Sequence, residues 1–253
     1  MKKYLKKIIE KILKKFGYKI QQVINNVIEE ASKEDIELMK LCDNYSMTSD
    51  LRKWALIQSF KYIIDNNIEG DFVECGVWKG GNLILIKKLM ERYNITNRKI
   101  FGYDTYEGMS EASNFDIKKD NTKASIKYEK LKKNNSNQIN WNFASKEEVI
   151  ENLNNNVKDT SNIDLIKGKV EETLQLSKNI PQKISVLRLD TDFYESTKIE
   201  LEVLYAKLSV GGVLIIDDYG SWKGSRKAVD EFFHNKKIWL HYIDHDGRLL
   251  IKR

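Results

Sequence analysis

The chain has 253 residues, enough to bury a full hydrophobic core as one large domain or as one domain with appendages. Hydrophobic residues make up 41% and charged residues 32%, and there is one proline among 13 glycines, which argues against a collagen-like or largely disordered chain. The two cysteines have no CxxC spacing, so a disulfide framework or a zinc site is not expected. Such cysteine usage favours a reducing, cytoplasmic compartment.

Positive charge is concentrated at the N-terminus. Residues 1–16, MKKYLKKIIEKILKKF, contain seven lysines and one glutamate, and so carry the whole formal net charge of +6. This placement argues against nucleic-acid binding, which needs a basic surface across the folded domain. Apolar residues recur on one face of the segment, which predicts a basic amphipathic helix, followed by a linker up to residue 46. The helix is too charged for a signal peptide. It can lie as a peripheral contact on the inner face of the cell membrane, or it can pack on a partner or on its own domain.

From residue 47 onward the pattern alternates between helices and short apolar strands. A helix is expected over 47–67, capped at Thr48 or Ser49, and strands are expected at 71–75, 99–103, 163–167, 184–189 and 212–216. The C-terminal sequence IWLHYIDHDGRLLIKR predicts an antiparallel hairpin that turns at Asp246 and Gly247. This order predicts an α/β fold with a doubly wound, mostly parallel sheet. Residues 105–145 are too long for a plain connection, and we expect an insertion over the carboxyl ends of the strands.

A glycine-containing turn follows the first predicted strand in the sequence VECGVWKGG. Glu74 ends the strand, Gly76 allows a tight turn, and Gly80 opens the next helix. The spacing lacks the second glycine of G-x-G-x-x-G, which admits a pyrophosphate, so it favours a ligand that has a ribose but no phosphates. Asp104, after the second strand, can accept both ribose hydroxyls. Each feature alone is also typical of a solvated turn, but their order is typical of S-adenosylmethionine binding.

Acidic residues end the fourth and fifth predicted strands. Asp190 in LRLDTDFYEST stands 27 residues before Asp217 in GGVLIIDDYG. The helix between them fits one right-handed crossover, so the strands are expected to be neighbours, about 4.8 Å apart. Carboxylates on both tips can then share one Mg²⁺, for which oxygen ligands are suited. The predicted metal ligands are Asp190, Asp217 and Asp218. Asp218 is the weaker choice, because successive strand residues point to opposite faces.

Two neighbouring residues are interpreted as structural. Either Asp192 or Ser196 is expected to cap the helix that follows the fourth strand. Arg188, which alternates in phase with Asp190, is expected to form a structural ion pair. Without a cation, the pair of acids in GGVLIIDDYG would be no more than a solvated turn.

The motifs together resemble the macrocin O-methyltransferase family. The resemblance covers roughly residues 47–253 and rests, in order, on GDFVECGVWKGG, YDTYEGMS, ASKEEVIENL, IKGKVEETL, VLRLDTDFYEST, YAKLSVGGVLIIDDYG and KAVDEF. Two departures are Thr191, where glycine is expected, and Cys75, where threonine is common. Neither removes a proposed ligand. The resemblance implies a Rossmann-like class I methyltransferase domain, with S-adenosylmethionine and Mg²⁺ as cofactors. It implies cofactor contacts at Glu74, Gly76 and Asp104. Gly80 is a further candidate for cofactor binding, because it opens the helix after the glycine turn. The resemblance also implies metal ligation by Asp190, Asp217 and Asp218.

The function implied by the resemblance is Mg²⁺-dependent methylation of a sugar hydroxyl, on a glycan or a glycosylated metabolite. Asp190 is the candidate general base, or serves as a ligand alone. The expected partner is a small-molecule or lipid-linked sugar, as in polysaccharide biosynthesis, and a homo-oligomer stays open. Two alternatives are an NAD(P)-dependent oxidoreductase on a similar sheet and a non-catalytic, membrane-associated subunit. The missing G-x-G argues against the first, and the retained acids argue against the second.

Overall fold

The computed structural model describes Leu13, residues 28–134 and residues 140–253. The predicted basic helix at 1–16 therefore lies, apart from Leu13, outside the described residues. Ser32–Arg253 forms one compact unit. None of the helices described here combines the length and the apolar character that a membrane span requires.

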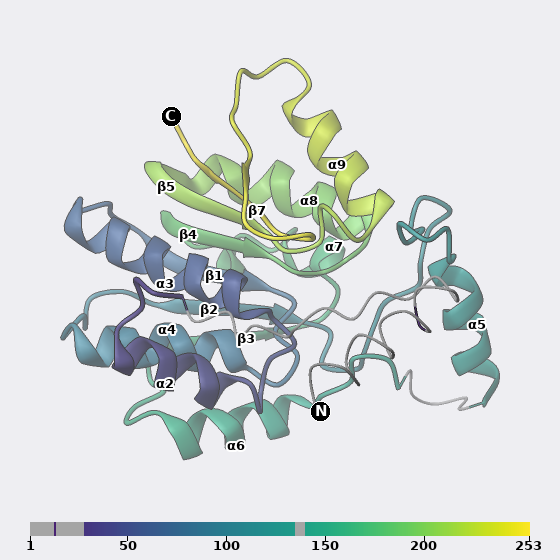
Figure 1. Cartoon of the computed structure of the whole chain (residues 1–253). Helices are drawn as coiled ribbons and strands as arrows, with labels where there is room; N and C mark the ends of the chain where they lie inside the picture. Colours follow the sequence, from purple (N-terminus) through teal and green to yellow (C-terminus); the bar gives the residue numbers. More distant parts are fainter. Residues whose placement is uncertain (1–12, 14–27, 135–139) are drawn as a thin grey trace. The chain divides into compact units, whose positions relative to one another are not determined.

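A seven-stranded sheet organises this unit (Figure 1). Its strand order is β3 (Ile163–Lys167), β2 (Ile100–Asp104), β1 (Asp71–Cys75), β4 (Ile184–Leu189), β5 (Leu208–Ile216), β7 (Arg248–Ile251) and β6 (His241–Tyr242). The first five strands are parallel, and β7 runs antiparallel to both β5 and β6. The predicted doubly wound sheet with an antiparallel C-terminal pair is confirmed.

The strand boundaries follow the apolar runs of the sequence closely. All six residues of β4 are buried, as a central parallel strand covered on both faces requires. The predicted strands at 71–75, 163–167 and 184–189 match β1, β3 and β4. β5 differs, because it begins at Leu208, four residues before the predicted start at Gly212.

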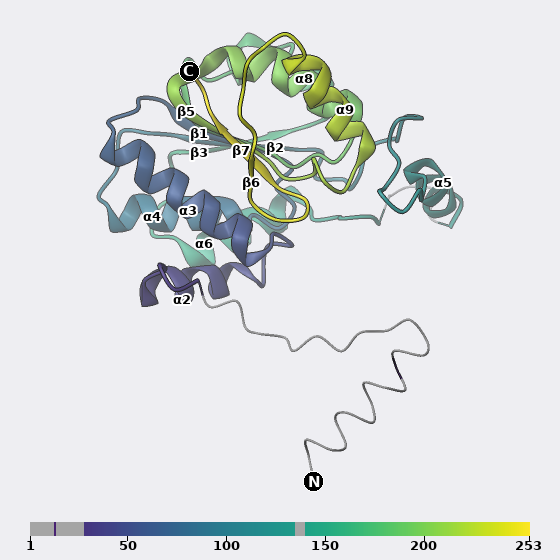
Figure 2. The same ribbon diagram turned by 45° about the horizontal axis from the view of Figure 1, so that its top comes forward.

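Helices cover both faces of the sheet (Figure 2). One face carries α3 (Asp50–Asp65), α4 (Gly81–Arg92) and α6 (Lys146–Asn156), and the other carries α8 (Tyr194–Leu204) and α9 (Lys223–Phe233). Short turns of helix complete the second layer: α7 (Val170–Thr173), η1 (Ser177–Asn179) and η2 (Tyr205–Lys207). Buried apolar residues of α8 and α9 pack on the sheet in one core cluster, which includes Leu201, Leu204, Val229 and Phe233.

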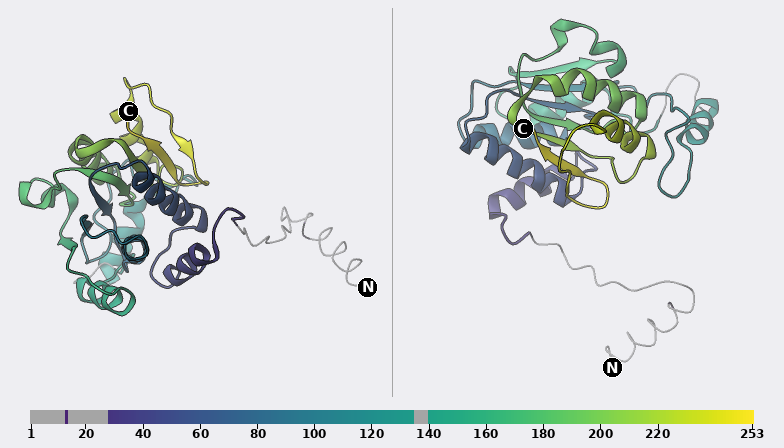
Figure 3. Two further views of the ribbon diagram at one scale, coloured as in Figure 1. Left: turned by 90° about the vertical axis from the view of Figure 1, so that its left-hand side faces the viewer. Right: turned by 90° about the horizontal axis from the view of Figure 1, so that it is seen from above.

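A further helix, α2 (Lys33–Cys42), precedes α3 (Figure 3). Its Asp35 is fully buried and accepts hydrogen bonds from Lys61 of α3 at 2.6 Å and from Arg92 of α4 at 2.7 Å. Residues 33–42, which the sequence analysis placed in the N-terminal linker, are thus tied to the helices of the sheet. Ser49, one of the two predicted cap residues, caps α3 by accepting from the backbone N–H of Arg52.

The insertion at 105–145 contains α5 (Ala124–Asn134), which lies beside the sheet in Figures 1 and 2. Its approach to the strands is fixed by a backbone bridge between Lys118 and Trp222, just after β5. An aromatic cluster that includes Trp141 of the insertion and Phe193 of the β4–α8 connection joins the same segments. The insertion therefore forms a wall next to the carboxyl ends of β4 and β5.

Candidate functional site

A cavity of about 570 Å³ lies at the carboxyl ends of the parallel strands. This is the usual position for a ligand in an open α/β sheet, and the volume is in the range of small-molecule sites. Its wall is built from the glycine turn after β1, the tip of β2, the loops after β4 and β5, and the insertion. Five of the predicted site residues line the cavity: Gly76, Asp104, Asp190, Asp217 and Asp218. Asp192, which was interpreted as structural, lines it as well.

Gly76 is required by the way in which the turn after β1 packs. Its φ of 86° lies in the left-handed region, and an added Cβ would lie 2.0 Å from the carbonyl oxygen of Asp190. Only glycine therefore lets this turn rest against the end of β4. Gly80 also has a positive φ and precedes α4, but it is not among the lining residues.

Asp104 holds the same turn from the tip of β2. Its Oδ2 accepts hydrogen bonds from the backbone N–H groups of Val77, at 2.7 Å, and Trp78, at 2.9 Å. Its Oδ1 accepts from the N–H of Tyr106 at 2.8 Å. Burial raises the pKa of Asp104, against the opposing effect of these backbone donors. The carboxylate that was predicted to bind ribose thus also shapes the loop around it.

Glu74 lies behind the cavity wall rather than in it. The side chain is buried, and its Oε1 accepts from Asn82 at 2.9 Å and from Arg188 at 2.6 Å. Asn82 does line the cavity, and Glu74 does not. Glu74 therefore reaches the site through the two side chains that it holds.

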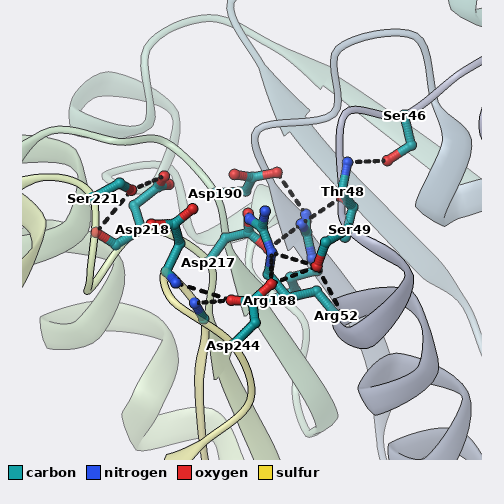
Figure 4. A network of polar contacts seen from close by, with 12 residues as sticks. Ser46, Thr48, Ser49, Arg52, Arg188, Asp190, Asp217, Asp218, Ser221 and Asp244 are labelled. Atoms are coloured by element: carbon teal, nitrogen blue, oxygen red, sulfur yellow. Dashed lines mark hydrogen bonds and ion pairs between the residues drawn. The ribbon is translucent and has the colours of Figure 1, made fainter. Parts of the chain in front are cut away.

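Arg188 of β4 connects several parts of the site (Figure 4). It is 1% exposed, and its Nη1 donates to Glu74 and, at 2.8 Å, to Asp190 Oδ2. Its Nη2 donates to Thr48 Oγ1 at 2.9 Å and to Asp217 Oδ1 at 2.5 Å. The expected ion pair with Asp190 is present, and it belongs to a network that also joins β1, β5 and the start of α3.

Asp217 is bound through both carboxylate oxygens. Arg188 takes one, and Arg52 of α3 takes the other. Arg52 also pairs with Asp244 at 3.0 Å, and Ser49 donates to the same Asp244 oxygen at 2.5 Å (Figure 4). Two guanidinium groups thus neutralise Asp217. Arg52 was not predicted as a site residue, because no sequence motif marks it.

Asp190, Asp192 and Asp218 form a separate acidic group. Each offers one carboxylate oxygen, and these oxygens all lie within 4.8 Å of one another. Asp192 was expected to cap α8, but that is wrong, because the N-cap is Phe193 and Asp192 itself has a φ of 68°. Asp218 follows the end of β5 at Ile216, so strand alternation no longer restricts its direction.

The electrostatics of this acidic group suit a divalent cation. Burial is the largest cause that raises the pKa of all three carboxyls, and it raises that of Asp192 to about 7. The neighbouring acids raise these pKa values further, because like charges in contact disfavour ionisation. Within the described residues, Asp218 Oδ2 is buried without a hydrogen-bond partner. Oxygen donors in this arrangement match the ligand preference of Mg²⁺ or Mn²⁺.

A doubly wound sheet of this order, with a glycine turn after β1 and an acid at the tip of β2, defines a class I S-adenosylmethionine-dependent methyltransferase. Comparison with known families narrows the class. The profile of the macrocin-O-methyltransferase (TylF) family matches residues 3–250, and the chain belongs to this family. It is therefore an S-adenosylmethionine-dependent O-methyltransferase. The family prediction is confirmed, and membership argues against the oxidoreductase and the non-catalytic alternatives.

Similar proteins with known names agree with this assignment. The demethyldecarbamoylnovobiocin O-methyltransferase of Streptomyces niveus is 32% identical over 192 residues, which cover 75% of this chain and 69% of the relative. The mycinamicin III 3''-O-methyltransferase of Micromonospora griseorubida is 26% identical over 167 residues, 66% of this chain and 61% of the relative. The solved structure of the O-methyltransferase NovP has a TM-score of 0.69 and 30% identity, and the match covers 82% of each chain.

Proposed function

We propose that this enzyme transfers the methyl group of S-adenosylmethionine to a sugar hydroxyl, with a divalent cation at the strand-end carboxylates. The observation that carries the proposal is that one cavity holds both the glycine turn with Asp104 and the acidic group of Asp190, Asp192 and Asp218. The sugar acceptor is supported by the relatives, one of which, from Streptomyces olivaceus, is named as a 4'-O-methyltransferase of a rhamnosyl-tetracenomycin.

The cofactor side of the cavity would bind and orient S-adenosylmethionine. The cofactor supplies an activated methyl group on its sulfonium, so the protein needs to supply position, charge and a proton acceptor. Gly76 leaves room for close approach to the backbone, and Asp104 presents a carboxylate to the ribose. Neither Glu74 nor Gly80 lines the cavity. Glu74 would contribute by positioning Asn82, and Gly80 would contribute by allowing the turn that precedes α4.

The cation would be held by Asp190, Asp218 and one further aspartate. Asp192 is favoured as the third donor, because its carboxylate lies within the acidic group whereas Asp217 is bound by Arg52 and Arg188. Ligation by Asp217, as predicted from the sequence, requires Arg52 to release one carboxylate oxygen. When bound, the cation supplies positive charge that lowers the pKa of a nearby sugar hydroxyl.

A carboxylate of the same group would take the hydroxyl proton. Asp190 is the candidate from the sequence, but its Oδ2 accepts from the buried Arg188, which lowers its basicity. Asp192 lines the cavity, has no arginine or lysine within ion-pair distance among the described residues, and has a pKa raised to about 7 by burial. A carboxyl with such a pKa is well matched to proton transfer near neutral pH, but ligation of the cation would lower it. Asp192 is therefore the alternative base to Asp190 only where Asp217 is the third donor to the cation.

The proposal is tested by incubating the purified protein with labelled S-adenosylmethionine and a panel of glycosides, with and without a chelator. Methylated sugar is expected, with loss of turnover on chelation and recovery on addition of Mg²⁺. Turnover that survives chelation would remove the cation from the proposal. Methylation of phenolic hydroxyls but of no sugar would remove the sugar acceptor. A peripheral membrane contact through residues 1–16, a homo-oligomer and a location at the inner face of the membrane stay predictions.

A further inference from the structure

The acceptor side of the cavity has an aromatic wall made by three separate segments. Trp141 comes from the insertion, Phe193 from the β4–α8 connection and Trp222 from the β5–α9 connection. Their ring centroids lie 6.0 Å (Trp141 to Phe193), 5.4 Å (Phe193 to Trp222) and 6.3 Å (Trp141 to Trp222) apart. All three are buried, and the two tryptophans line the cavity. A rigid aromatic surface of this kind is suited to the apolar face of a ring-shaped ligand.

Two lysines stand over this wall. Lys127 Nζ lies 3.9 Å from the ring centroid of Trp141, and Lys118 Nζ lies 5.3 Å from that of Trp222. Both lysines line the cavity. Their placement follows from the fold, because the Lys118 backbone bridges to Trp222, and Ala124, one turn before Lys127 on α5, packs in the aromatic cluster. Cation–π contact therefore holds both ammonium groups at the cavity surface.

Neither lysine is neutralised by a carboxylate in the part of the chain that the structure describes. The neighbouring Lys119 lies 3.8 Å from Asp246, whereas none of the described acidic residues lies within 4.0 Å of Lys118 or Lys127. Asp120, which also lines the cavity, accepts from the N–H of Thr122 in its own loop at 2.9 Å. Burial lowers the pKa of Lys127, and the charge of Lys118 lowers it further. The charge of Asp192 opposes both effects on Lys127. Two neighbouring cations that repel each other form a favourable site for an anion.

The surrounding segment adds to this charge. Residues 117–133 contain seven lysines and only two acidic residues, although the chain beyond residue 16 is formally neutral as a whole. Of these lysines, Lys118, Lys119 and Lys127 line the cavity. Lys130 and Lys133 of α5 are exposed and do not line the cavity. A basic segment at one side of a concave site raises the local concentration of anionic ligands there.

We propose that the acceptor carries its sugar on a phosphate or diphosphate group, with the sugar ring in the cavity beside the aromatic wall and the phosphoryl oxygens on Lys118 and Lys127. Lysine binds phosphate as a compact charge, and a phosphate offers several strong acceptor oxygens. This inference rests on the proposed function, because it specifies the acceptor of the same site. The phosphoryl group takes no part in the bond changes: the carbon–oxygen bond forms as the carbon–sulfur bond breaks, and the hydroxyl proton passes to a carboxylate.

The first test measures binding without turnover. Inorganic pyrophosphate is titrated into the full chain at fixed ionic strength and followed by calorimetry, with the double variant Lys118→Gln/Lys127→Gln beside it. Loss of two charge-assisted contacts is expected to weaken pyrophosphate binding by roughly tenfold to a hundredfold. The matched control is Lys130→Gln/Lys133→Gln, which removes the same charge from α5 outside the cavity and is expected to bind pyrophosphate almost as the unaltered chain does. Equal affinities in both double variants would overturn the inference.

The second test measures methyl transfer to one sugar presented in four forms: a nucleoside diphosphate sugar, a polyprenyl diphosphate sugar, a methyl glycoside and the corresponding uronic acid. At least one diphosphate form is expected to have a KM lower than that of the methyl glycoside by about tenfold or more. This advantage should disappear in Lys118→Gln/Lys127→Gln and be kept in Lys130→Gln/Lys133→Gln. The diphosphate form that is methylated identifies the source of the acceptor. A KM for the glycoside or the uronic acid as low as for the diphosphates would overturn the inference.

The two tests also separate this inference from the proposed function. If no sugar is methylated in any form, the sugar acceptor is wrong, and the pyrophosphate titration still decides whether Lys118 and Lys127 form an anion site. If sugars are methylated without preference for a phosphoryl group, the proposed function stands and the anionic acceptor is wrong.

Discussion

Replacement of Arg188 by methionine tests the network that supports the site. The side chain is 1% exposed and donates to Glu74, Asp190, Asp217 and Thr48. Methionine fills similar space but leaves three carboxylates without this buried partner. Removal of one partner from a buried ion pair costs about 3–5 kcal/mol. In a domain of this size that corresponds to a fall in melting temperature of about 6–20 °C.

The loss of stability should also depend on pH. Burial raises the pKa of Glu74, and Arg188 opposes that rise, so the Glu74 pKa in Arg188→Met should lie further above its value in the unfolded chain. An acid with a raised folded pKa destabilises the fold above that pKa, and the penalty shrinks as the pH falls through it. The difference in unfolding free energy from the unaltered chain should therefore be larger at about pH 8 than at about pH 5.

Thermal and urea denaturation at both pH values measure these effects. The control is Arg226→Met on α9, an exposed arginine paired with Asp230 at 3.8 Å. This change should alter the unfolding free energy by less than about 0.5 kcal/mol. A melting temperature of Arg188→Met within a few degrees of the unaltered chain, or a deficit that stays the same at both pH values, would refute the reasoning.

Two further predictions concern ligand binding. Gly76→Ala places a Cβ 2.0 Å from the carbonyl oxygen of Asp190 in a left-handed backbone, so calorimetry should show S-adenosylhomocysteine affinity reduced by about tenfold or more, and an unchanged affinity would contradict the assigned packing. Asp192→Asn should weaken Mn²⁺ binding by about tenfold or more, and Asp217→Asn by less, because guanidinium groups hold both oxygens of Asp217. A larger loss of Mn²⁺ affinity in Asp217→Asn than in Asp192→Asn would show that Asp217, and not Asp192, is the third metal ligand.

The parallel strands could be predicted because the local sequence pattern of each strand is enough to identify it. β1 and β4 are short, mostly apolar segments, as expected for strands buried on both faces of a parallel sheet. The role of α2 could not be predicted in the same way. Its sequence is mostly polar, and Asp35 is stabilised by Lys61 and Arg92, two side chains far along the chain that only the tertiary fold brings together.

The site was predictable wherever topology alone places a residue. Parallel strands end at one edge of the sheet, which brings Asp104, Asp190 and Asp218 to one cavity. Asp192 was misassigned because an aspartate just before a helix resembles a cap residue, whereas the N-cap position falls on Phe193. The left-handed φ of Asp192 depends on the packing of the loop after β4. Arg52 lies on α3 in a sequence without any recognisable motif. Its ion pair with Asp217, which is far along the chain, forms only in the tertiary fold.

The adjacent acids of GGVLIIDDYG have different surroundings because β5 ends at Ile216. The N–H of Asp217 still donates to Leu189 of β4 at 2.9 Å, so Asp217 stays over the neighbouring strand, beside Arg188. Asp218 begins a turn, in which its carbonyl accepts from the N–H groups of Ser221, at 3.1 Å, and Trp222, at 3.0 Å. One turn thus positions both a carboxylate of the acidic group and Trp222 of the aromatic wall. A change in this turn is therefore expected to disturb cation binding and acceptor binding together.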